Sequence, residues 1–256
     1  PNIFNRRHTG INVWWRFYFF VVPLFPVNLC IINSYLMKHV NLILTFWLTV
    51  CMLLTGCSTS KDGEKHNFSI GKGTFLLDGK PFVIKAAEIH YTRIPADYWE
   101  HRIQMCKALG MNTICIYAFW NIHEQKPGEF NFEGQNDIAR FCRLAQKHGM
   151  YIMLRPGPYV CSEWEMGGLP WWLLKKKDIK LRTNDPYFLE RTQLFMHEIG
   201  KQLADLQVSR GGNIIMVQVE NEYGAYATDK AYIANIRDIV KKAGFTDVPL
   251  FQCDWS

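Results

Sequence analysis

Two glutamates at the end of an apolar run could act as acids. Residues 213–219 are largely apolar, as in a buried strand, and Glu220, Asn221 and Glu222 follow directly. Aromatic side chains around a carboxyl group disfavour its charged form, so its pKa rises and it can donate a proton near neutral pH. Solvated or ion-paired glutamates at a strand end explain the same spacing equally well. The spacing alone leaves catalysis and a structural role open.

The segment 161–172 is a second candidate group. It holds two glutamates, Glu163 among them, three tryptophans and a Gly-Gly pair. Aromatic faces beside carboxylates suit sugars, because the C–H faces of a sugar stack on rings while its hydroxyl groups form hydrogen bonds. For Trp171 and Trp172 we favour the alternative, in which both open a helix and pack inward. Trp164 fits either interpretation.

The spacing of histidines, cysteines and serines in the sequence indicates neither a metal site nor a serine nucleophile. His90 and His123 have no partner at the spacing of metal ligands, so we expect each to be a hydrogen-bonded histidine that orients a neighbour. The chain has no Cys-x-x-Cys pattern and no Gly-x-Ser-x-Gly nucleophile turn. We therefore expect no metal and no cofactor.

Apolar runs alternate with helical patterns from residue 73 onward. A hairpin with Asp78-Gly79 as its turn leads into a strand over 82–86. Further strands are expected over 113–117, 151–154, 213–219 and 248–252, and helices over 98–109, 138–148, 186–206 and 231–243. Strands that are apolar throughout and alternate with helices predict a parallel sheet covered by helices.

Two architectures share this pattern, an open doubly wound sheet and a (β/α)8 barrel. No Gly-rich phosphate loop follows the first strand, which argues against a dinucleotide-binding sheet. A full barrel needs about 250 residues, and the chain holds only five expected strands. Polar and aromatic residues follow several of these strands, as in barrel active sites, at 88–91, 117–124, 155–159 and 220–223. We predict an α/β fold, a (β/α)8 TIM barrel truncated after about the fifth strand.

The charge of the chain argues against a nucleic-acid partner. The net charge is +6, from 29 Lys and Arg against 23 Asp and Glu. Residues 1–56 contain four of the basic residues and none of the acidic ones, so residues 57–256 are close to neutral. No dense Lys/Arg stripe remains there, which a nucleic-acid-binding surface would need.

The N-terminal segment has the pattern of an export signal. From Met37, a short basic start precedes an apolar run over 40–54, and Leu54-Thr-Gly-Cys57 resembles the lipobox of bacterial lipoproteins. In such proteins the cysteine carries the lipid that holds the mature protein at a membrane. A transmembrane anchor is the alternative, since residues 11–56 hold two apolar stretches, but polar residues interrupt them.

We expect four segments. Residues 1–36 are upstream translated sequence outside the fold, 37–56 a lipoprotein signal peptide, 57–72 a polar tether that begins at the lipid-bearing Cys57, and 73–256 the N-terminal part of the barrel. The protein is accordingly expected to be an exported bacterial lipoprotein, periplasmic or at the cell surface, and anchored to a membrane through its lipid.

Three long segments resemble the glycoside hydrolase family 35 β-galactosidases. The resemblance runs from about Gly73 to Ser256, and the segments are AAEIHYTRIPADYWEHRIQMCKALGMNTICIYAFWNIHE, RPGPYVCSEWEMGGLPWWLL and VQVENEYGAY. It implies a (β/α)8 catalytic barrel that releases terminal β-linked galactose with retention of configuration. No cofactor is implied, since two carboxylates suffice for this chemistry.

Site residues carry over from the family one at a time. The resemblance implies that Glu222 is the acid/base and that Asn221 beside it contacts the sugar. Tyr117 matches a sugar-binding tyrosine of the family, and Glu163 matches a substrate-binding acid. Ser162 stands where many members have alanine, a small change that leaves the site compatible with substrate.

The attacking carboxylate of the family has no counterpart in this chain. The resemblance places it near the end of a seventh strand, whereas the sequence stops at Ser256, just after the fifth. Glu220 is a poor substitute, because it shares a strand with Glu222. We therefore expect the full-length parent to be a retaining exo-β-galactosidase, acting on terminal non-reducing β-D-galactose of glycans or oligosaccharides. We expect residues 57–256 alone to be inactive and unstable.

Two rival functions stay open at this point. One is a related retaining barrel glycosidase of another sugar specificity, such as a β-glucosidase, because specificity depends on hydrogen bonds that the sequence does not resolve. The other is a non-catalytic, lipid-anchored glycan-binding protein, which would keep the aromatic and polar pocket but lack a second carboxylate. The presence of Glu222 argues against the second.

Overall fold

The computed structural model describes residues 63–254. The predicted signal segment and the predicted lipid site Cys57 lie outside this range. Across the described residues, no helix combines the length and the apolar character that crossing a membrane requires.

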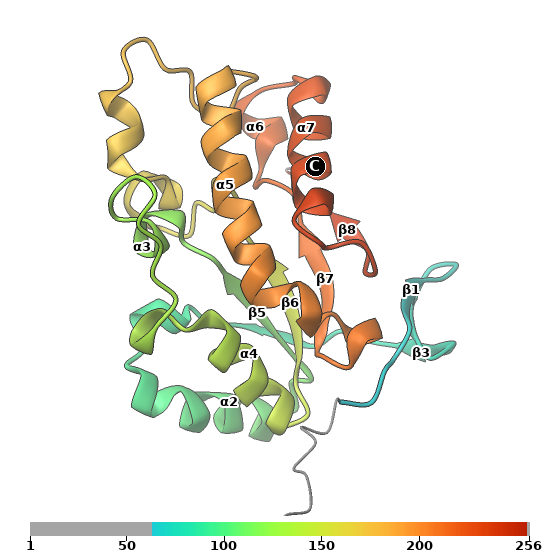
Figure 1. The fold of residues 1–256 in the computed structure, drawn as a ribbon. Coiled ribbons are helices and arrows are strands. Elements are labelled where there is room, and N and C mark those ends of the chain that lie inside the picture. Colours follow the sequence, from blue (N-terminus) through green and yellow to red (C-terminus); the bar gives the residue numbers. More distant parts are fainter. Residues whose placement is uncertain (1–62, 255–256) are drawn as a thin grey trace, which may run out of the picture. The chain divides into compact units, whose positions relative to one another are not determined.

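Within residues 63–254, five parallel strands form the central sheet, in the order β4-β5-β6-β7-β8 (Figure 1). Each strand after the first pairs with the strand just before it in the sequence. Both β5 and β7 are buried along their whole length, as expected of strands covered on two faces. The bounds are Ala86–Glu88 (β4), Thr113–Tyr117 (β5), Tyr151–Arg155 (β6), Ile214–Gln218 (β7) and Leu250–Phe251 (β8). The sheet confirms the predicted partial α/β barrel.

In the part of the chain that the structure describes, four helices of ten or more residues lie against one face of the sheet (Figure 1). They are α2 (Trp99–Ala108), α4 (Ile138–Lys147), α5 (Pro186–Leu203) and α7 (Lys230–Lys242). The carboxylates of Asp137, Asp185 and Asp229 accept hydrogen bonds from backbone N–H groups in the first turns of the last three. All four helices were predicted, and their bounds agree with the prediction to within one residue except at the end of the predicted helix over 186–206, which tightens into a 3-10 turn.

Short helices connect these elements and complete the core. The ring of Trp120 stacks on Phe195 of α5 with 5.1 Å between ring centroids, so the short helix that begins at Trp120 packs against α5. The remaining helices are α3 (Trp120–His123), α6 (Tyr223–Tyr226), η1 (Tyr91–Arg93), η2 (Ala96–Tyr98), η3 (Gly134–Asn136), η4 (Glu165–Gly168), η5 (Trp171–Lys175), η6 (Ala204–Leu206) and η7 (Val208–Arg210).

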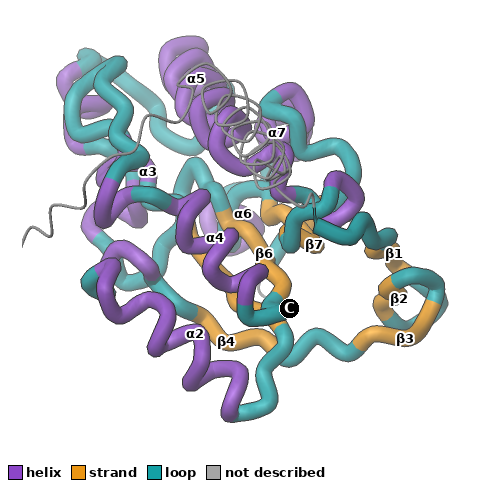
Figure 2. The backbone as a smooth tube through the Cα atoms, turned by 60° about the horizontal axis from the view of Figure 1, so that its bottom comes forward, coloured by secondary structure: helices purple, strands orange, loops and turns teal. Residues whose placement is uncertain are grey.

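A small antiparallel sheet lies beside the parallel one, formed by β1 (Phe68–Ile70), β2 (Phe75–Leu77) and β3 (Lys80–Phe82) (Figure 2). The hairpin of β2 and β3 turns at Asp78-Gly79 as predicted. The predicted strand over 82–86 is wrong, because β3 ends at Phe82 and β4 begins at Ala86. Between the two strands, backbone groups form hydrogen bonds with the Asn112 side chain and not with a neighbouring strand. Its oxygen accepts from the N–H of Lys85 (2.9 Å), and its nitrogen donates to the carbonyl of Val83 (2.8 Å).

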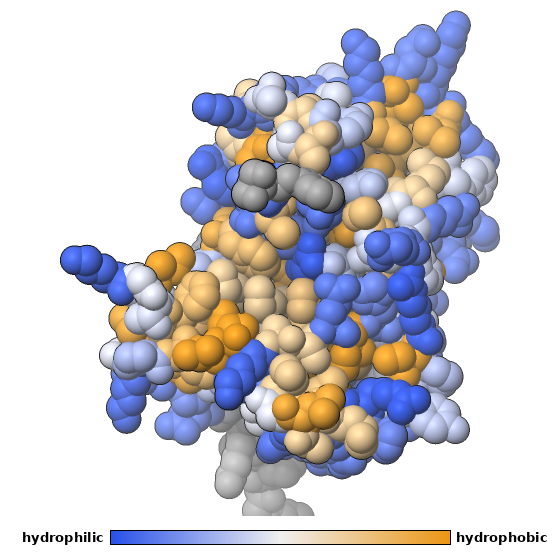
Figure 3. All heavy atoms as spheres, turned by 180° about the vertical axis from the view of Figure 1, so that it is seen from behind, coloured by the Kyte–Doolittle hydropathy of each residue, from blue (hydrophilic) through white to orange (hydrophobic). Residues whose placement is uncertain are grey.

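Apolar groups also reach the surface on the side away from α5. Figure 3 shows them gathered over the small antiparallel sheet and continuing across the middle of that face. Ile70 and Val83, at 65% and 68% exposure, belong to this part of the chain. The helices of Figure 1 therefore cover one side of the parallel sheet and leave the other less covered.

Candidate active site

Polar side chains meet at the edge of the sheet where the parallel strands end. Glu88 is the last residue of β4, Tyr117 of β5 and Arg155 of β6, while Asn221 and Glu222 follow β7. Since parallel strands end at one edge, residues far apart in the sequence become neighbours there. The predicted clustering of polar residues after the strands is confirmed.

Arg155 connects the groups at this edge. Its Nη1 donates to the hydroxyl of Tyr117 and lies 3.4 Å from Oε2 of Glu88, while its Nη2 donates to Oδ1 of Asn221 at 2.5 Å. The hydroxyl of Tyr117 in turn donates to Oε2 of Glu88 at 2.9 Å. Two predicted sugar-contacting residues, Tyr117 and Asn221, are thus held on one guanidinium.

Tyr117 is set up as a hydrogen-bond donor. Burial raises the pKa of its hydroxyl well above the ordinary value, and Arg155 offsets only part of that rise. The guanidinium carbon of Arg155 also lies 4.2 Å from the centroid of the Tyr117 ring. Neutral Tyr117 can therefore present its O–H to a carboxylate or to a sugar oxygen across the ordinary pH range.

Glu220 has a structural role. Its carboxylate is fully buried and accepts from Nε and Nη2 of Arg182 at 3.1 and 2.7 Å, and from the hydroxyl of Tyr232 at 2.7 Å. The backbone N–H of Asn221 also donates to it at 2.7 Å. The ion-paired interpretation of the sequence is thus the right one for Glu220, and its carboxylate is fully engaged.

Glu222 is different in its surroundings. It is half-buried, and within residues 63–254 its carboxylate makes no hydrogen bond or ion pair, whereas its backbone N–H donates to the carbonyl of Cys253 at 2.9 Å. Glu220 and Glu222 both have positive φ, at 60° and 47°, so the chain leaves the strand in a tight turn. The turn separates the two carboxylates, so that the one of Glu220 lies in the interior and the one of Glu222 is half-buried.

The loop after β6 carries Ser162 and Glu163 in an unusual backbone conformation. Cys161, Ser162 and Glu163 all have positive φ, between 44° and 59°. Nη2 of Arg93 holds this turn by donating to the carbonyls of Ser162 (3.0 Å) and Glu163 (2.8 Å). Ser162 is buried, whereas the side chain of Glu163 is exposed. Among the described residues, Glu163 makes no bond to the Arg155 group.

His90 joins this loop to the strand ends. Its Nδ1 lies 2.8 Å from Nη1 of Arg93, and its Nε2 lies 2.9 Å from Oε1 of Glu88. His123 is buried, with Nδ1 2.9 Å from the carbonyl of Asn131 and Nε2 bonded to the hydroxyl of Tyr91. Both histidines are hydrogen-bonded, as predicted, and His90 orients a neighbour at the site.

The two adjacent tryptophans behave differently. Trp172 is buried, and its Nε1–H donates to the carbonyl of Glu124 at 2.9 Å, as predicted. The same prediction is wrong for Trp171, which is 53% exposed. Successive residues of the short helix η5 point in different directions, so packing Trp172 inward turns Trp171 outward. Trp164 is half-buried and packs on Phe119, with 4.7 Å between ring centroids.

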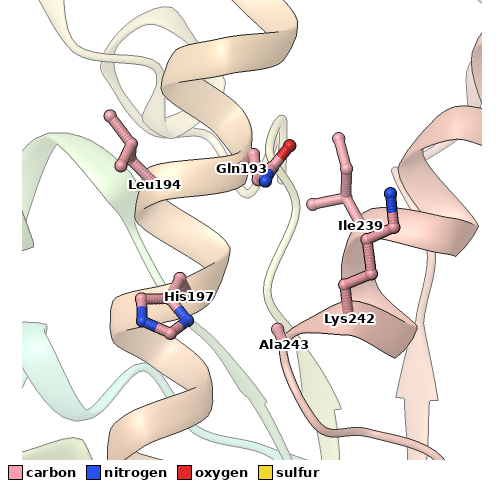
Figure 4. A pocket seen from close by; sticks show the side chains of 6 residues that line it. All are labelled: Gln193, Leu194, His197, Ile239, Lys242 and Ala243. Carbon is pink, nitrogen blue, oxygen red and sulfur yellow. The ribbon is translucent and has the colours of Figure 1, made fainter.

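Trp171 and Glu163 line an open cleft of about 710 Å³ at the end of the sheet where the site lies. Another hollow, of about 240 Å³, lies between α5 and α7 (Figure 4). Its lining includes His197 and Lys242 but no carboxylate, so it offers no pair of groups for acid and base chemistry. The strand-end site is the candidate active site.

Arg155, Glu88 and Arg93 were not assigned roles from the sequence. The available signal was positional, because Glu88 and Arg155 each directly follow apolar strand residues. Arg93 gave no such signal, since its partners lie 69 and 70 residues away.

Two solved structures illustrate the similarity of the fold to known proteins. An exo-β-1,4-mannosidase from Opitutaceae bacterium strain TAV5 matches with a TM-score of 0.52 and 19% identity, over 64% of this chain and 30% of that protein. A GH5_18 protein from Streptomyces cattleya in complex with GlcNAc matches with a TM-score of 0.53 and 13% identity, over 67% and 44%. At these identities the likeness concerns the fold, a partial α/β barrel.

The sequence itself defines the family. The model for the glycosyl hydrolases family 35 matches residues 74–256, and the chain belongs to this family. A β-galactosidase of Xanthomonas manihotis is 48% identical over 180 residues, which cover 70% of this chain and 30% of that protein. The Homo sapiens β-galactosidase is 40% identical over 210 residues, 81% of this chain and 31% of the human protein. The chain thus spans about a third of the length of these relatives.

Proposed function

We propose that this protein acts as a retaining exo-β-galactosidase on terminal non-reducing β-D-galactose of glycans or oligosaccharides. Membership of family 35 and the similarity to proteins named β-galactosidase support the reaction class and the sugar. The observation that carries the proposal is the set of contacts of Arg155. Its guanidinium donates to both Tyr117 and Asn221, and Asn221 directly precedes Glu222 in the sequence.

In the proposed first step, protonated Glu222 gives its proton to the glycosidic oxygen while a second carboxylate attacks the anomeric carbon. The bond to the leaving alcohol breaks and a galactosyl ester forms. In the second step, Glu222 removes a proton from water, which attacks the same carbon and releases β-galactose and the carboxylate. The family resemblance assigns the attacking carboxylate to a later strand than the five described, and the buried ion pair of Glu220 makes it unsuited to that role.

The acid/base role is tested with Glu222→Gln in the whole protein. We expect turnover of a galactoside with an alkyl or sugar leaving group to fall by about 10² to 10⁴, because that leaving group needs a proton. Turnover of a dinitrophenyl galactoside should fall far less, because its leaving group departs unprotonated. Glu190→Gln on the exposed side of α5 is the matched control. Equal losses on both substrates would count against the acid/base role, and faster turnover of an aryl glucoside than of the aryl galactoside would count against the sugar.

We also propose that the protein is a lipoprotein held at a membrane through Cys57, in the periplasm or at the cell surface. The support is the sequence pattern before Cys57, a basic start, an apolar run and Leu-Thr-Gly-Cys. In cells given a labelled fatty acid, wild-type protein should carry label in the membrane fraction, and Cys57→Ser should carry none. Label retained by Cys57→Ser would refute the assignment.

A further inference from the structure

The cleft beside the candidate site is lined by groups that none of the proposed catalytic steps use. It has a volume of about 710 Å³ and includes Trp171, Glu163, Glu165, Asn121 and Gln125. We propose that this cleft binds the sugar that follows the terminal galactose of the substrate, with the indole ring of Trp171 as its stacking surface. The proposal rests on the proposed β-galactosidase function. It assigns a binding site to the second sugar of the substrate, for which the proposed function names no contacts.

Trp171 is the aromatic surface still available in the cleft. It is 53% exposed, although it belongs to a residue type that usually buries most of its surface. Nζ of Lys175 lies 4.6 Å from the centroid of the ring, which leaves the other ring face for a ligand. The ring of Trp164 is already in contact with Phe119 and with the guanidinium of Arg93, each at 4.7 Å. A ring face at the mouth of a cleft suits the C–H face of a sugar.

The polar lining suits an uncharged ligand with many hydroxyl groups. Amides and carboxylates of the cleft offer both donors and acceptors, as sugar hydroxyls require. The two acids, Glu163 and Glu165, are balanced by Arg93 and Lys126. Arg93 is further committed to backbone carbonyls and His90, so few of its N–H donors remain for an anionic ligand.

The cleft adjoins the groups expected to hold galactose. Arg93 lines the cleft and is hydrogen-bonded to His90, which is in turn hydrogen-bonded to Glu88. The carboxylate of Glu88 accepts a hydrogen bond from the hydroxyl of Tyr117. Glu163 lines the cleft as well, and its backbone carbonyl is held by the same Arg93. A galactoside whose first ring contacted Tyr117 could therefore extend its second ring toward Trp171.

The test compares binding of a β-galactosyl disaccharide, lactose, with binding of galactose. Calorimetric titrations use the whole protein with Glu222→Gln, so that little substrate is consumed during a titration. We expect lactose to bind more tightly than galactose, and Trp171→Ala to reduce the ratio of the two affinities about tenfold. Trp171→Phe should retain most of that ratio, because it keeps a ring. Leu174→Ala is the matched control, since Leu174 lies on the same short helix, is 57% exposed and does not line the cleft.

The possible outcomes separate this proposal from the proposed function. An unchanged affinity ratio in Trp171→Ala, or lactose bound no more tightly than galactose, would overturn the cleft proposal even if the wild-type protein hydrolyses galactosides. A ratio that falls in Trp171→Ala while the wild-type protein hydrolyses no galactoside would support the cleft as a glycan site and refute the enzyme. A fall of the same size in Leu174→Ala would show a general disturbance of η5 and overturn the role of Trp171.

Discussion

The guanidinium of Arg182 and the carboxylate of Glu220 form a buried ion pair, with Nη2 2.7 Å from Oε2. Nη2 of Arg182 also donates to the carbonyl of Asn221 at 2.6 Å, and the guanidinium carbon lies 4.0 Å from the centroid of the Tyr159 ring. Arg182 thus joins the segment before α5 to the turn that carries Asn221 and Glu222. The position of the proposed acid depends on a pair of residues that have no expected contact with substrate.

Breaking this ion pair should destabilise the protein. Glu220→Gln leaves the Arg182 charge buried without a counter-ion, and we expect the free energy of unfolding to fall by about 3 kcal/mol. Urea denaturation measures this loss. Asp238→Asn removes one partner of the exposed pair with Arg237, and it should cost no more than about 0.5 kcal/mol. Similar losses in the two variants would contradict the structural role of Glu220.

Arg155→Lys should impair catalysis. A lysine ammonium cannot repeat the planar fork that reaches Tyr117 and Asn221 together. Loss of one charge-assisted hydrogen bond is expected to lower kcat/KM for an aryl β-galactoside roughly 10- to 100-fold. Arg143→Lys, an exposed position on α4, provides the comparison and should stay within twofold of wild type. Retention of wild-type kcat/KM by Arg155→Lys would remove Arg155 from the site.

His123 should make stability depend on pH. Burial lowers its pKa to about 4, although the bond to the carbonyl of Asn131 acts in the opposite direction. An unfolded histidine titrates near 6.5, so between about pH 6.5 and 4 the unfolded chain binds a proton that the native protein excludes. Stability should consequently fall as pH drops, and His123 should account for a loss of about 2 kcal/mol between pH 7 and pH 5.

Urea denaturation at both pH values tests this assignment. His123→Gln should be less stable at pH 7 but should lose about 2 kcal/mol less than wild type on going to pH 5. His101→Gln, at an exposed position of α2, should keep the wild-type dependence. An unchanged pH dependence in His123→Gln would show that another group is responsible.

The contact between α5 and α7 should tolerate no side chain at Gly200. A Cβ there would lie 2.0 Å from the carbonyl oxygen of Ala243. Gly200→Ala is expected to lower the free energy of unfolding by about 1–3 kcal/mol, despite the better helix propensity of alanine. Lys201→Ala, one residue further along the same helix and exposed, should be within about 0.5 kcal/mol of wild type. A Gly200→Ala variant of wild-type stability would mean that the helices can move apart at no cost.

Local patterns were sufficient to predict most of the fold. The apolar run 113–117 and the capping Asp185 each determine their element through neighbouring residues, so β5 and the start of α5 lie where the sequence placed them. The break between β3 and β4 could not be predicted from local patterns. The side chain that bonds to the backbone there belongs to Asn112, which is 27 residues away from Lys85 in the sequence.

The site was predictable only in part, for a related reason. Tyr117, Asn221 and Glu222 end or follow apolar runs, so they could be recognised as site candidates. The contacts of Arg155 with Asn221 and of Arg182 with Glu220 join residues 66 and 38 positions apart, which no local spacing encodes. Whether Trp171 or Trp172 faces the core likewise depends on what each side of η5 packs against.

The strand order has a consequence for synthesis. Each of β5 to β8 pairs with the strand just before it, so every strand finds its neighbour already made when the ribosome delivers it. Pairing of consecutive strands avoids waiting for partners from more distant parts of the chain. This part of the protein can therefore assemble vectorially, one strand and its helix at a time, in the order of translation.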